Sequence, residues 1–241
     1  MNMLRNDEEK QEILDRLEPT RVIKNCISVE MMDMLRGVYA NSEKNFKNTG
    51  PITVDYFPRK PPYEDWWLTI DKLITPYIGK HSTFTTNFYE VEYPHILHND
   101  DSIAIKPRLH KTVVIPLEIS KPTEFAIFNQ CYLDGPVKLR HGGVRHNKTH
   151  DKPTTYYNTD LMDNSKLINY TGLDFDPELW EEKFSHFAIE RFHGLSVESI
   201  VKWNPGDMII FDTARIHCAT DFRKQGITRK LGYSIFTAKE D

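Results

Sequence analysis

Residues 203–222 read WNPGDMIIFDTARIHCATDF, and this stretch decides what kind of fold the sequence can adopt. A turn at Pro205-Gly206-Asp207 precedes the apolar run MIIF (208–211), and His217 follows after a few residues. A short apolar run bounded by proline and glycine is typical of a buried strand. We therefore expect a strand that begins after the turn, with His217 shortly behind it.

Four further segments have the composition of strands. They are short, rich in β-branched and aromatic residues, and bounded by proline, aspartate or glycine, which is typical of strands. They are FTTNFYEVEY (84–93), KTVVIPLEI (111–119), EFAIFNQCYL (124–133) and TRKLGYSIFTA (228–238). Together with the first stretch they predict a β-core over residues 81–132 and 202–241.

The rest of the chain has a different pattern. Residues 1–80 look mostly helical, with Ser28 as a candidate N-cap and a helix over PPYEDWWLTIDKLITPYIG (61–79). Residues 133–201 lack this strand-like pattern, and a span of this length between two groups of strands is usually an insertion or a lid. We find no repeat or linker. We expect a single domain, mainly β with flanking helices, whose core is a barrel or sandwich.

Composition excludes several classes of protein. With 241 residues, 39% of them apolar, the chain can form a core, so wholesale disorder is excluded. A net charge of −4 makes nucleic acid an unlikely partner, and no apolar run approaches the roughly 20 residues that span a bilayer. Three dispersed cysteines (Cys26, Cys131, Cys218) and a polar start unlike a secretory signal predict a cytoplasmic protein with reduced thiols. The sequence does not indicate an oligomeric state.

The segment YPHILHNDDS (93–102) holds the first candidates for chemistry. The sequence has no GxGxxG, GxxxxGK[ST], GxSxG or HExxH motif. Their absence disfavours a dinucleotide-binding protein, a P-loop protein and an α/β-hydrolase. His98 and Asp100 lie two residues apart at the end of an expected strand, and alternation places them on one side. With His217 they would form a facial triad, which suits non-haem Fe(II) because three coordination positions stay open.

The order of these parts resembles the 2-oxoglutarate/Fe(II)-dependent oxygenases, closest to the phytanoyl-CoA-hydroxylase-like and related branches. The order is a strand, the His-x-Asp pair, more strands, the Pro-Gly-Asp turn, an apolar strand, a histidine and a basic residue that enters the last strand. The resemblance covers roughly residues 84–237 without the insertion. It implies a double-stranded β-helix (jelly roll, cupin-like) core with Fe(II), 2-oxoglutarate and O₂, and His98, Asp100 and His217 as metal ligands.

The family's basic anchor for the far carboxylate of 2-oxoglutarate falls on Arg229 or Lys230. The sequence lacks the commonest pattern, an arginine with a serine two positions later on the same face. In a strand, Lys230 and Ser234 share one face with a glycine between them, whereas Arg229 shares the other with leucine, tyrosine and isoleucine. Small and polar neighbours suit a bound co-substrate, so we favour Lys230 with Ser234 beside it and keep Arg229 as the alternative.

The resemblance implies a 2-oxoglutarate-dependent dioxygenase, specifically a hydroxylase of a small-molecule or peptidyl substrate. The reaction would convert 2-oxoglutarate to succinate and CO₂. The carboxylate of Asp100 argues against halogenation, because halogenating relatives carry a small residue there. The alternative is a non-catalytic jelly-roll module that uses the insertion to hold a partner.

Other histidines are weaker candidates. His95 lies three residues before His98, and we expect it either to lie beside the metal ligands without binding the metal or to lie at the surface. His141, His146 and His150 lie among arginines and lysines of the predicted insertion. They form either a solvated loop or a region that captures an anionic substrate.

Overall fold

In the computed structural model of the protein, a six-stranded antiparallel sheet forms the larger half of the core. The structure describes residues 5–42, 52–55, 64–101, 109–139, 159–161 and 163–240. The strand order is β1-β9-β4-β11-β3-β2. The strands are β1 (Arg21–Ile23), β2 (Ile52–Asp55), β3 (His81–Val91), β4 (Leu109–Ile119), β9 (Met208–Asp212) and β11 (Lys230–Lys239).

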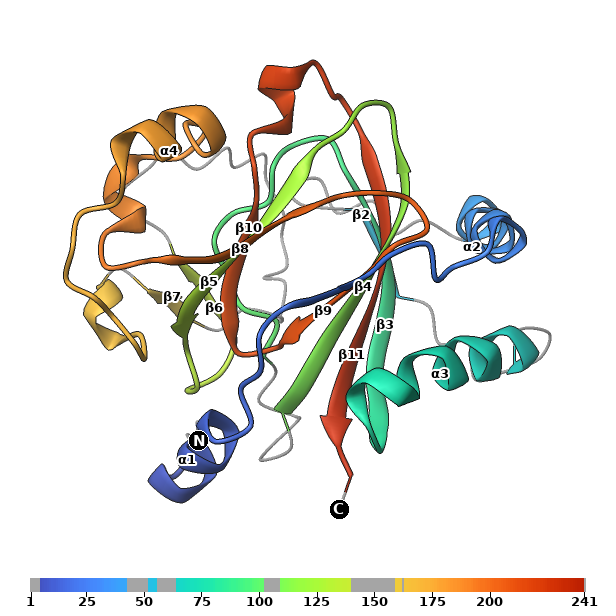
Figure 1. Cartoon of the computed structure of the whole chain (residues 1–241), viewed down its shortest axis with the longest axis horizontal. Helices are drawn as coiled ribbons and strands as arrows, with labels where there is room; N and C mark the ends of the chain where they lie inside the picture. The colour runs from blue at the N-terminus through green and yellow to red at the C-terminus, as the bar shows by residue number, and fades with distance from the viewer. Residues whose placement is uncertain are drawn as a thin grey trace, which may run out of the picture.

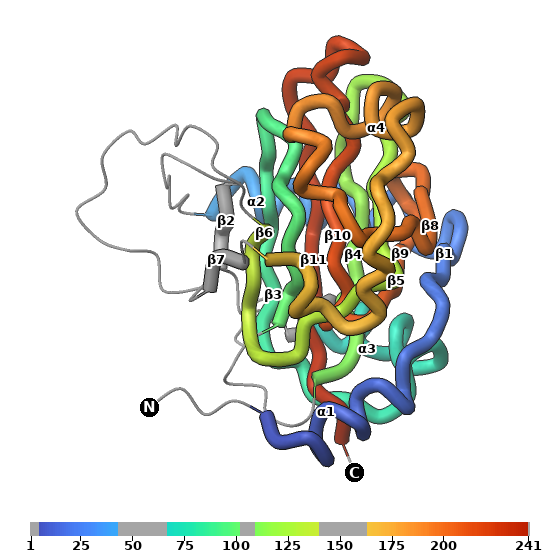
Figure 2. Tube along the Cα trace, turned by 90° about the vertical axis from the view of Figure 1, so that its left-hand side faces the viewer, coloured from blue at the N-terminus to red at the C-terminus, as the bar shows by residue number. Residues whose placement is uncertain are grey.

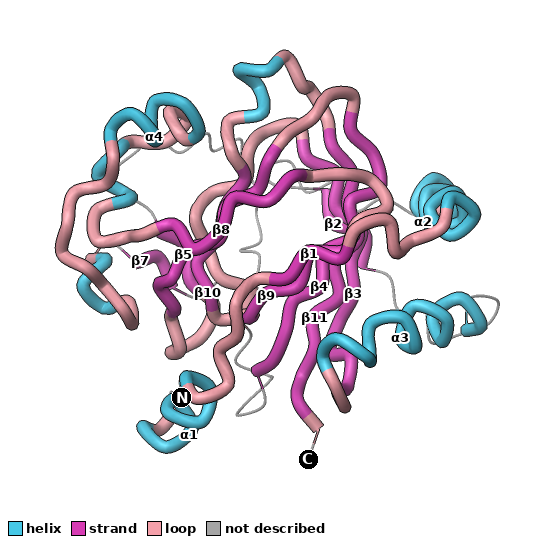
Figure 3. Tube along the Cα trace, in the orientation of Figure 1, coloured by secondary structure: helices cyan, strands magenta, loops and turns pink. Residues whose placement is uncertain are grey.

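A three-stranded antiparallel sheet faces the larger one. Its central strand is β5 (Glu124–Cys131), which pairs with β8 (Val197–Lys202) and β10 (Arg215–Ala219). The strands of the two sheets lie on opposite sides of a common interior (Figure 3), and buried side chains from both sheets pack there, among them Val114 and Phe125. The predicted mainly β fold is therefore confirmed.

Two helices cover the outer face of the larger sheet, α2 (Val29–Asn41) and α3 (Glu64–Ile78), as Figure 1 shows on the right. Ser28 caps α2, because its side chain accepts a hydrogen bond from the backbone N–H of Met31 at 3.2 Å. Leu35 of α2 and Ile70 of α3 are fully buried against the sheet. Three residues of β11 pack against these helices, and they alternate along the strand: Leu231, Tyr233 and Ile235. The other face of β11 is left for the interior.

The first 80 residues also contribute strands that the sequence did not predict. β1 and β2 add to opposite edges of the larger sheet, and they are only three and four residues long. Runs this short cannot show the alternation from which a strand is predicted. A third helix of this region, α1 (Asp7–Leu14), begins with a capping box between Asn6 and Glu9. Figure 2 shows α1 and the end of β11 at the same end of the molecule.

The remaining elements cover the outer side of the smaller sheet. Helix α4 (Pro177–Lys183) lies beside β8 and β5 at the left of Figure 1, and β6 (Val137–Leu139) pairs in parallel with β7 (Thr159–Leu161). Because β8 belongs to the smaller sheet, the end of the predicted insertion (133–201) contributes to the core. The division of the single domain into helical support, β-core and insertion remains a prediction. The basic loop with His141, His146 and His150 lies outside the described residues. Within the described parts, no helix combines the length and apolarity needed to cross a bilayer.

Replacing Ile70 by alanine should destabilise the protein. The side chain is 0% exposed between α3 and the larger sheet, so its loss leaves a cavity, and we expect the free energy of unfolding to fall by about 2–5 kcal/mol. Leu68→Ala on the same helix is the control, because Leu68 is 47% exposed and should cost less than about 0.5 kcal/mol. Urea unfolding measures both values. Equal losses would contradict the packing of α3 described above.

Candidate metal centre

A cavity of about 110 Å³ lies between the two sheets. Aromatic and aliphatic side chains form its walls, and its polar side chains gather at two places. Such convergent polar groups in an apolar pocket are typical of a binding site. The lining residues are Asn87, Tyr89, Val91, His95, His98, Asp100, Val114, Phe125, Trp203, His217, Ala219, Lys230, Ser234 and Phe236.

His98, Asp100 and His217 converge at the first of these places. Their candidate ligand atoms all lie within 4.8 Å of one another. The Nε2 atom of His98 is 3.6 Å from Asp100 Oδ1, and the Nε2 atom of His217 is 3.4 Å from Asp100 Oδ2. The structure therefore brings together the three residues that the sequence singled out, although His217 is distant from the others along the chain.

A backbone pairing between two segments produces this convergence. The N–H of His98 donates to the carbonyl of His217 at 3.0 Å, and the N–H of His217 donates back to the carbonyl of His98 at 2.8 Å. The N–H of Asp100 donates to the carbonyl of Thr213 at 3.1 Å. The expectation that His98 and Asp100 lie at the end of a strand is wrong, because β3 ends at Val91. His98 lies beyond it and forms two isolated bridges, one to Lys138 and one to His217. The bridged backbone still directs both side chains to one centre, as alternation requires.

Backbone carbonyls set the tautomers of both imidazoles. His98 Nδ1 lies 2.7 Å from the carbonyl oxygen of Ile96, and His217 Nδ1 lies 3.0 Å from that of Arg215. A carbonyl oxygen only accepts, so Nδ1 carries the hydrogen and Nε2 of the neutral ring keeps its lone pair. Burial lowers the pKa of His98 well below its ordinary value, which keeps that ring neutral. The Nε2 lone pairs are thereby directed to the centre, as metal ligation needs.

Asp100 supplies the negative charge of the centre. Burial alone would raise the pKa of its carboxyl group. The rings of His217 and His98 and a hydrogen bond from Thr112 outweigh burial, so the pKa lies below its ordinary value. The group is therefore a carboxylate at neutral pH, and its two oxygens face the two imidazoles.

This donor set fits a divalent transition metal. Two imidazole nitrogens and one carboxylate oxygen are the combination found in non-haem Fe(II) centres. Neighbouring ligands bonded at about 2.1 Å in such a centre lie roughly 3 Å apart. The one donor atom that each of His98, Asp100 and His217 offers lies within 4.8 Å of the other two, so the three side chains surround a common centre.

Lys230 lies at the second polar place in the cavity. It is only 3% exposed, and its Nζ lies 4.1 Å from the ring centroid of Trp203 and 5.3 Å from that of Phe222. Burial lowers the pKa of Lys230 to about 7. Among the described residues, no carboxylate forms an ion pair with this ammonium group. A buried lysine of this kind in a cavity is a candidate for anion binding.

Arg229 lies on the opposite face of β11. Its side chain is 40% exposed and forms ion pairs of 2.7 Å with Glu90 and with Glu118. The hydroxyl of Tyr39 donates to the same Glu90 carboxylate, so this cluster links α2 to the sheet. Of the two alternatives that the sequence left, the structure thus places Lys230 in the cavity and Arg229 outside it.

Gly232 separates Lys230 from Ser234 on the cavity face of β11. A Cβ atom at this position would lie 2.8 Å from Cζ2 of Trp203 and 2.8 Å from the phenol of Tyr89, which is closer than real Cβ contacts. Glycine is therefore needed so that both rings can approach the strand. Tyr89 is hydrogen bonded to Ser234, and burial raises its pKa well above the ordinary value, so the phenol is neutral.

His95 lies beside the centre, which is one of the two positions that the sequence left open. It lines the cavity, and its ring centroid is 4.1 Å from that of His98. It does not belong to the converging group of three. Burial, together with the charge of Lys138, lowers the pKa of His95 to about 3, so the ring is neutral.

Other lining residues were not assigned to the site from the sequence, among them Asn87, Tyr89 and Trp203. Asn87 and Tyr89 alternate on β3 and face the cavity together with Val91, so the period of two was the available signal. Trp203 follows the end of β8, where no alternation applies. Its position between the sheets depends on tertiary packing.

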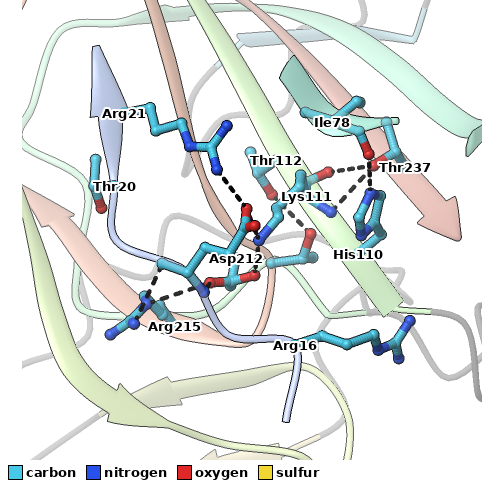
Figure 4. Close-up of polar contacts among 12 residues, drawn as sticks. Arg16, Thr20, Arg21, Ile78, His110, Lys111, Thr112, Asp212, Arg215 and Thr237 are labelled. Atoms are coloured by element: carbon cyan, nitrogen blue, oxygen red, sulfur yellow. Dashed lines mark hydrogen bonds and ion pairs between the residues drawn. The ribbon is translucent and has the colours of Figure 1, made fainter. Parts of the chain in front are cut away.

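A buried ion cluster supports the turn between β9 and β10. Asp212 pairs with Lys111 and, at 3.6 Å, with Arg215, as Figure 4 shows. It also accepts a hydrogen bond of 2.8 Å from the backbone N–H of Glu18. Because the carbonyl of Arg215 orients the His217 ring, this cluster helps to hold one of the three converging side chains.

No protein-family model matches the sequence, and no curated protein matches it either. Solved structures are similar. The non-haem α-ketoglutarate-dependent carbocyclase SnoK from nogalamycin biosynthesis is 11% identical, with a TM-score of 0.53 over 98% of this chain and 85% of that one. The epimerase SnoN from the same biosynthesis, in a complex with Fe³⁺, α-ketoglutarate and nogalamycin RO, is 12% identical, with a TM-score of 0.50 over 96% and 84%. The chain has the fold of these enzymes.

That fold confirms the predicted jelly-roll core. The two facing antiparallel sheets are its double-stranded β-helix, and the helices α2 and α3 flank it. At 11% and 12% identity the likeness concerns the fold. The roles of the cavity residues therefore rest on their own geometry.

Replacing Lys230 by methionine should stabilise the protein. The folded-state pKa of about 7 lies below the ordinary 10.5, so the unfolded chain binds the proton more tightly. The penalty is fully present below pH 7 and disappears as the pH rises toward 10.5. Since one pKa unit corresponds to about 1.4 kcal/mol, we expect a gain of roughly 2–4 kcal/mol at pH 6 and a smaller one at pH 9.5.

Urea unfolding at the two pH values measures this difference. Arg229→Met on the opposite face of β11 is the control, and it should lose a little stability because it breaks two partly exposed ion pairs. A Lys230→Met variant that is less stable than the wild type at pH 6 would show that the ammonium group is not buried without a partner.

Proposed function

We propose that the protein is an Fe(II)- and 2-oxoglutarate-dependent oxygenase that hydroxylates a small-molecule or peptidyl substrate. One observation carries this proposal: a single cavity contains both a set of metal donors and a buried ammonium group that lacks an acidic partner among the described residues. A dicarboxylate that chelates a metal at one end and meets a cation at the other would satisfy both. 2-Oxoglutarate has these two ends.

His98, Asp100 and His217 would hold Fe(II) through two Nε2 atoms and one carboxylate oxygen. The bound metal would supply the oxidative chemistry that couples the conversion of 2-oxoglutarate and O₂ to succinate and CO₂ with oxidation of the substrate. The chain's own part is orientation. The carbonyls of Ile96 and Arg215 keep both imidazoles in the ligating tautomer, so no rearrangement is needed before the metal binds.

Lys230 would bind the far carboxylate of 2-oxoglutarate, with Ser234 and Tyr89 beside it. An ammonium group makes a point-charge contact in place of the two-point contact of an arginine. The attraction is stronger in this buried place than in water because the local dielectric constant is lower. Burying an ammonium group is unfavourable in the free protein, and the bound carboxylate would remove that penalty.

Aromatic rings would shield the centre from water. The ring centroid of Phe125 lies 5.3 Å from that of His217, and the centroid of Phe211 lies 4.8 Å from it. An apolar wall of this kind limits side reactions with solvent. SnoK is a carbocyclase and SnoN an epimerase, so this fold supports several oxidative outcomes. We propose hydroxylation or another oxidation rather than halogenation, because Asp100 occupies the third protein position, where halogenation would need room for a halide.

We also infer that the protein works in the cytoplasm. Its three cysteines are free thiols, and Cys131 and Cys218 are buried. Burial raises the pKa of both thiols, which disfavours the reactive thiolate. Unpaired cysteines are typical of a reducing compartment.

Anaerobic addition of Fe(II) and 2-oxoglutarate should give a visible charge-transfer band, and O₂ should then release succinate. Asp100→Ala should abolish both signals, because the metal loses its anionic ligand. Lys230→Met should keep metal binding but bind 2-oxoglutarate roughly 10–100-fold more weakly, since a charged contact contributes about 1.5–3 kcal/mol. Absorption spectra, metal content and a succinate assay measure these effects. A non-catalytic binding module would show neither the band nor succinate.

The affinity for 2-oxoglutarate should fall as the pH rises above 7. The pKa of Lys230 is about 7 in the free protein, so above that pH the amine must take up a proton when the carboxylate binds. By linkage, the affinity should fall by up to about tenfold per pH unit. Lys230→Arg keeps its charge, so its affinity should stay constant between pH 6.5 and 9. Calorimetry in two buffers of different ionisation enthalpy measures the proton uptake; none at pH 8 would contradict the role of Lys230.

A further inference from the structure

The segment that carries His98 and Asp100 lies between β10 and β6 and is not part of a regular strand. Its pairing with β10 brings the two histidines together. On the other side, the N–H of Leu139 donates to the carbonyl of Leu97 at 2.9 Å, and the N–H of Asn99 donates to that of Val137 at 3.3 Å. Since the backbone alternates, Asn99 and the residue after Asp100 point away from the metal centre.

Asn99 is fully buried and ties this segment to the loop between β5 and β6. Its Nδ2 donates to the carbonyls of Tyr132 at 3.0 Å and Gly135 at 3.1 Å, and its Oδ1 accepts from the N–H of Val137 at 2.8 Å. Both amide hydrogens and one oxygen lone pair are used. The side chain cannot rotate without leaving buried backbone groups unpaired, so it fixes the backbone between the two ligands.

Asp101 holds the same segment from its other end. Its carboxylate forms a two-point ion pair with Arg5, in which Nη2 and Oδ1 are 2.7 Å apart and both side chains are fully buried. Arg5 also donates to the carbonyl of Leu133 at 2.5 Å, in the loop that Asn99 holds. A buried ion pair contributes little net stability, because desolvation offsets the attraction. Its two-point geometry does restrict orientation.

We propose that Asn99 and the Arg5–Asp101 pair are positioning residues that set the geometry of the metal centre. This inference rests on the proposed function, because it concerns the same ligands. Metal–ligand bonds of about 2.0–2.2 Å require donors held within about 0.5 Å. In the described part of the chain, two isolated bridges of His98 and a few backbone hydrogen bonds also hold the segment. The side chain of Asn99 is the first clamp of the segment, and the Arg5–Asp101 ion pair is the second. Both act from the side of the segment that faces away from the metal, so His98 and Asp100 keep their spacing.

Asn99→Leu tests the first clamp. Leucine has nearly the same shape but cannot bond the loop, so the spacing of His98 and Asp100 should relax. We expect Co(II), used as a spectroscopic probe, to bind about 10–100-fold more weakly, as when the partners of metal ligands are removed. The d–d absorption bands of the bound Co(II) should also change shape, because they report the ligand geometry.

Gln130→Met is the matched control. Gln130 of β5 is also fully buried, and its Nε2 donates to the carbonyl of Asn169 at 2.7 Å and to Oγ of Ser196 at 3.2 Å. Its Oε1 accepts from the N–H of Ser196 at 2.9 Å. The variant therefore loses the same kinds of hydrogen bond away from the cavity. It should lose a similar amount of stability and leave the affinity and spectrum of Co(II) unchanged.

Arg5→Met/Asp101→Leu tests the second clamp and carries the test if Asn99→Leu does not fold. It removes both charges together, so no buried charge is left unpaired. Lys10→Met/Asp134→Leu is its control, because that 2.6 Å ion pair joins α1 to the same loop and is partly exposed. Only the first double variant should weaken Co(II) binding.

Co(II) titration followed by absorption, together with urea unfolding of the metal-free proteins, tests whether the two clamps position the metal ligands. Weaker binding with an altered spectrum in the clamp variants, and not in their controls, supports the proposal. Unchanged binding in the clamp variants, or an equal loss in Gln130→Met, overturns it and leaves the metal site intact. If the wild type and Asp100→Ala bind Co(II) equally, the proposed metal site is wrong, and the positioning role is wrong with it.

Discussion

The reciprocal backbone hydrogen bonds between His98 and His217 are the constraint on which the site depends. They bring a segment from the middle of the chain into register with β10 near its end, and alternation then directs both rings and Asp100 to one point. Register is strict in such a pairing, because a slip by one residue turns a side chain to the other face. The surrounding elements serve this register: the Asp212 cluster supports the turn before β10, and Asn99 holds the opposite segment.

The cavity gathers groups that are unfavourable to bury. Lys230 lacks an acidic partner in the described part of the chain, and the centre holds a carboxylate beside two imidazoles. The rest of the fold offsets these penalties with apolar packing on both faces of the larger sheet, where α2 and α3 cover the outside and aromatic rings fill the inside. Departures from good packing rules that concentrate in one cavity are typical of functional sites. This contrast between the cavity and its surroundings supports an anionic ligand and a metal.

Much of this arrangement could be predicted from particular residues. The five strand-like segments and the capping role of Ser28 followed from local propensity, and the parity of β11 separated Lys230 from Arg229 correctly in space. The short edge strands β1 and β2 could not be predicted, because three or four residues are too few to show a period. The ion pair between Arg5 and Asp101 could not be predicted either, because no local sequence pattern links an arginine near the start to an aspartate in a distant loop.

The sequence by itself determined the fold class, the order of the candidate ligands and the face of β11 on which each residue lies. These properties depend on local propensity and on the period of a strand, which neighbouring residues encode. Only the tertiary structure decided that the two imidazoles share one centre, that His95 stands beside it, and that Asn99 and Asp101 hold it from behind. These contacts join segments that are distant along the chain, and their geometry depends on sheet register and packing, which no local pattern specifies.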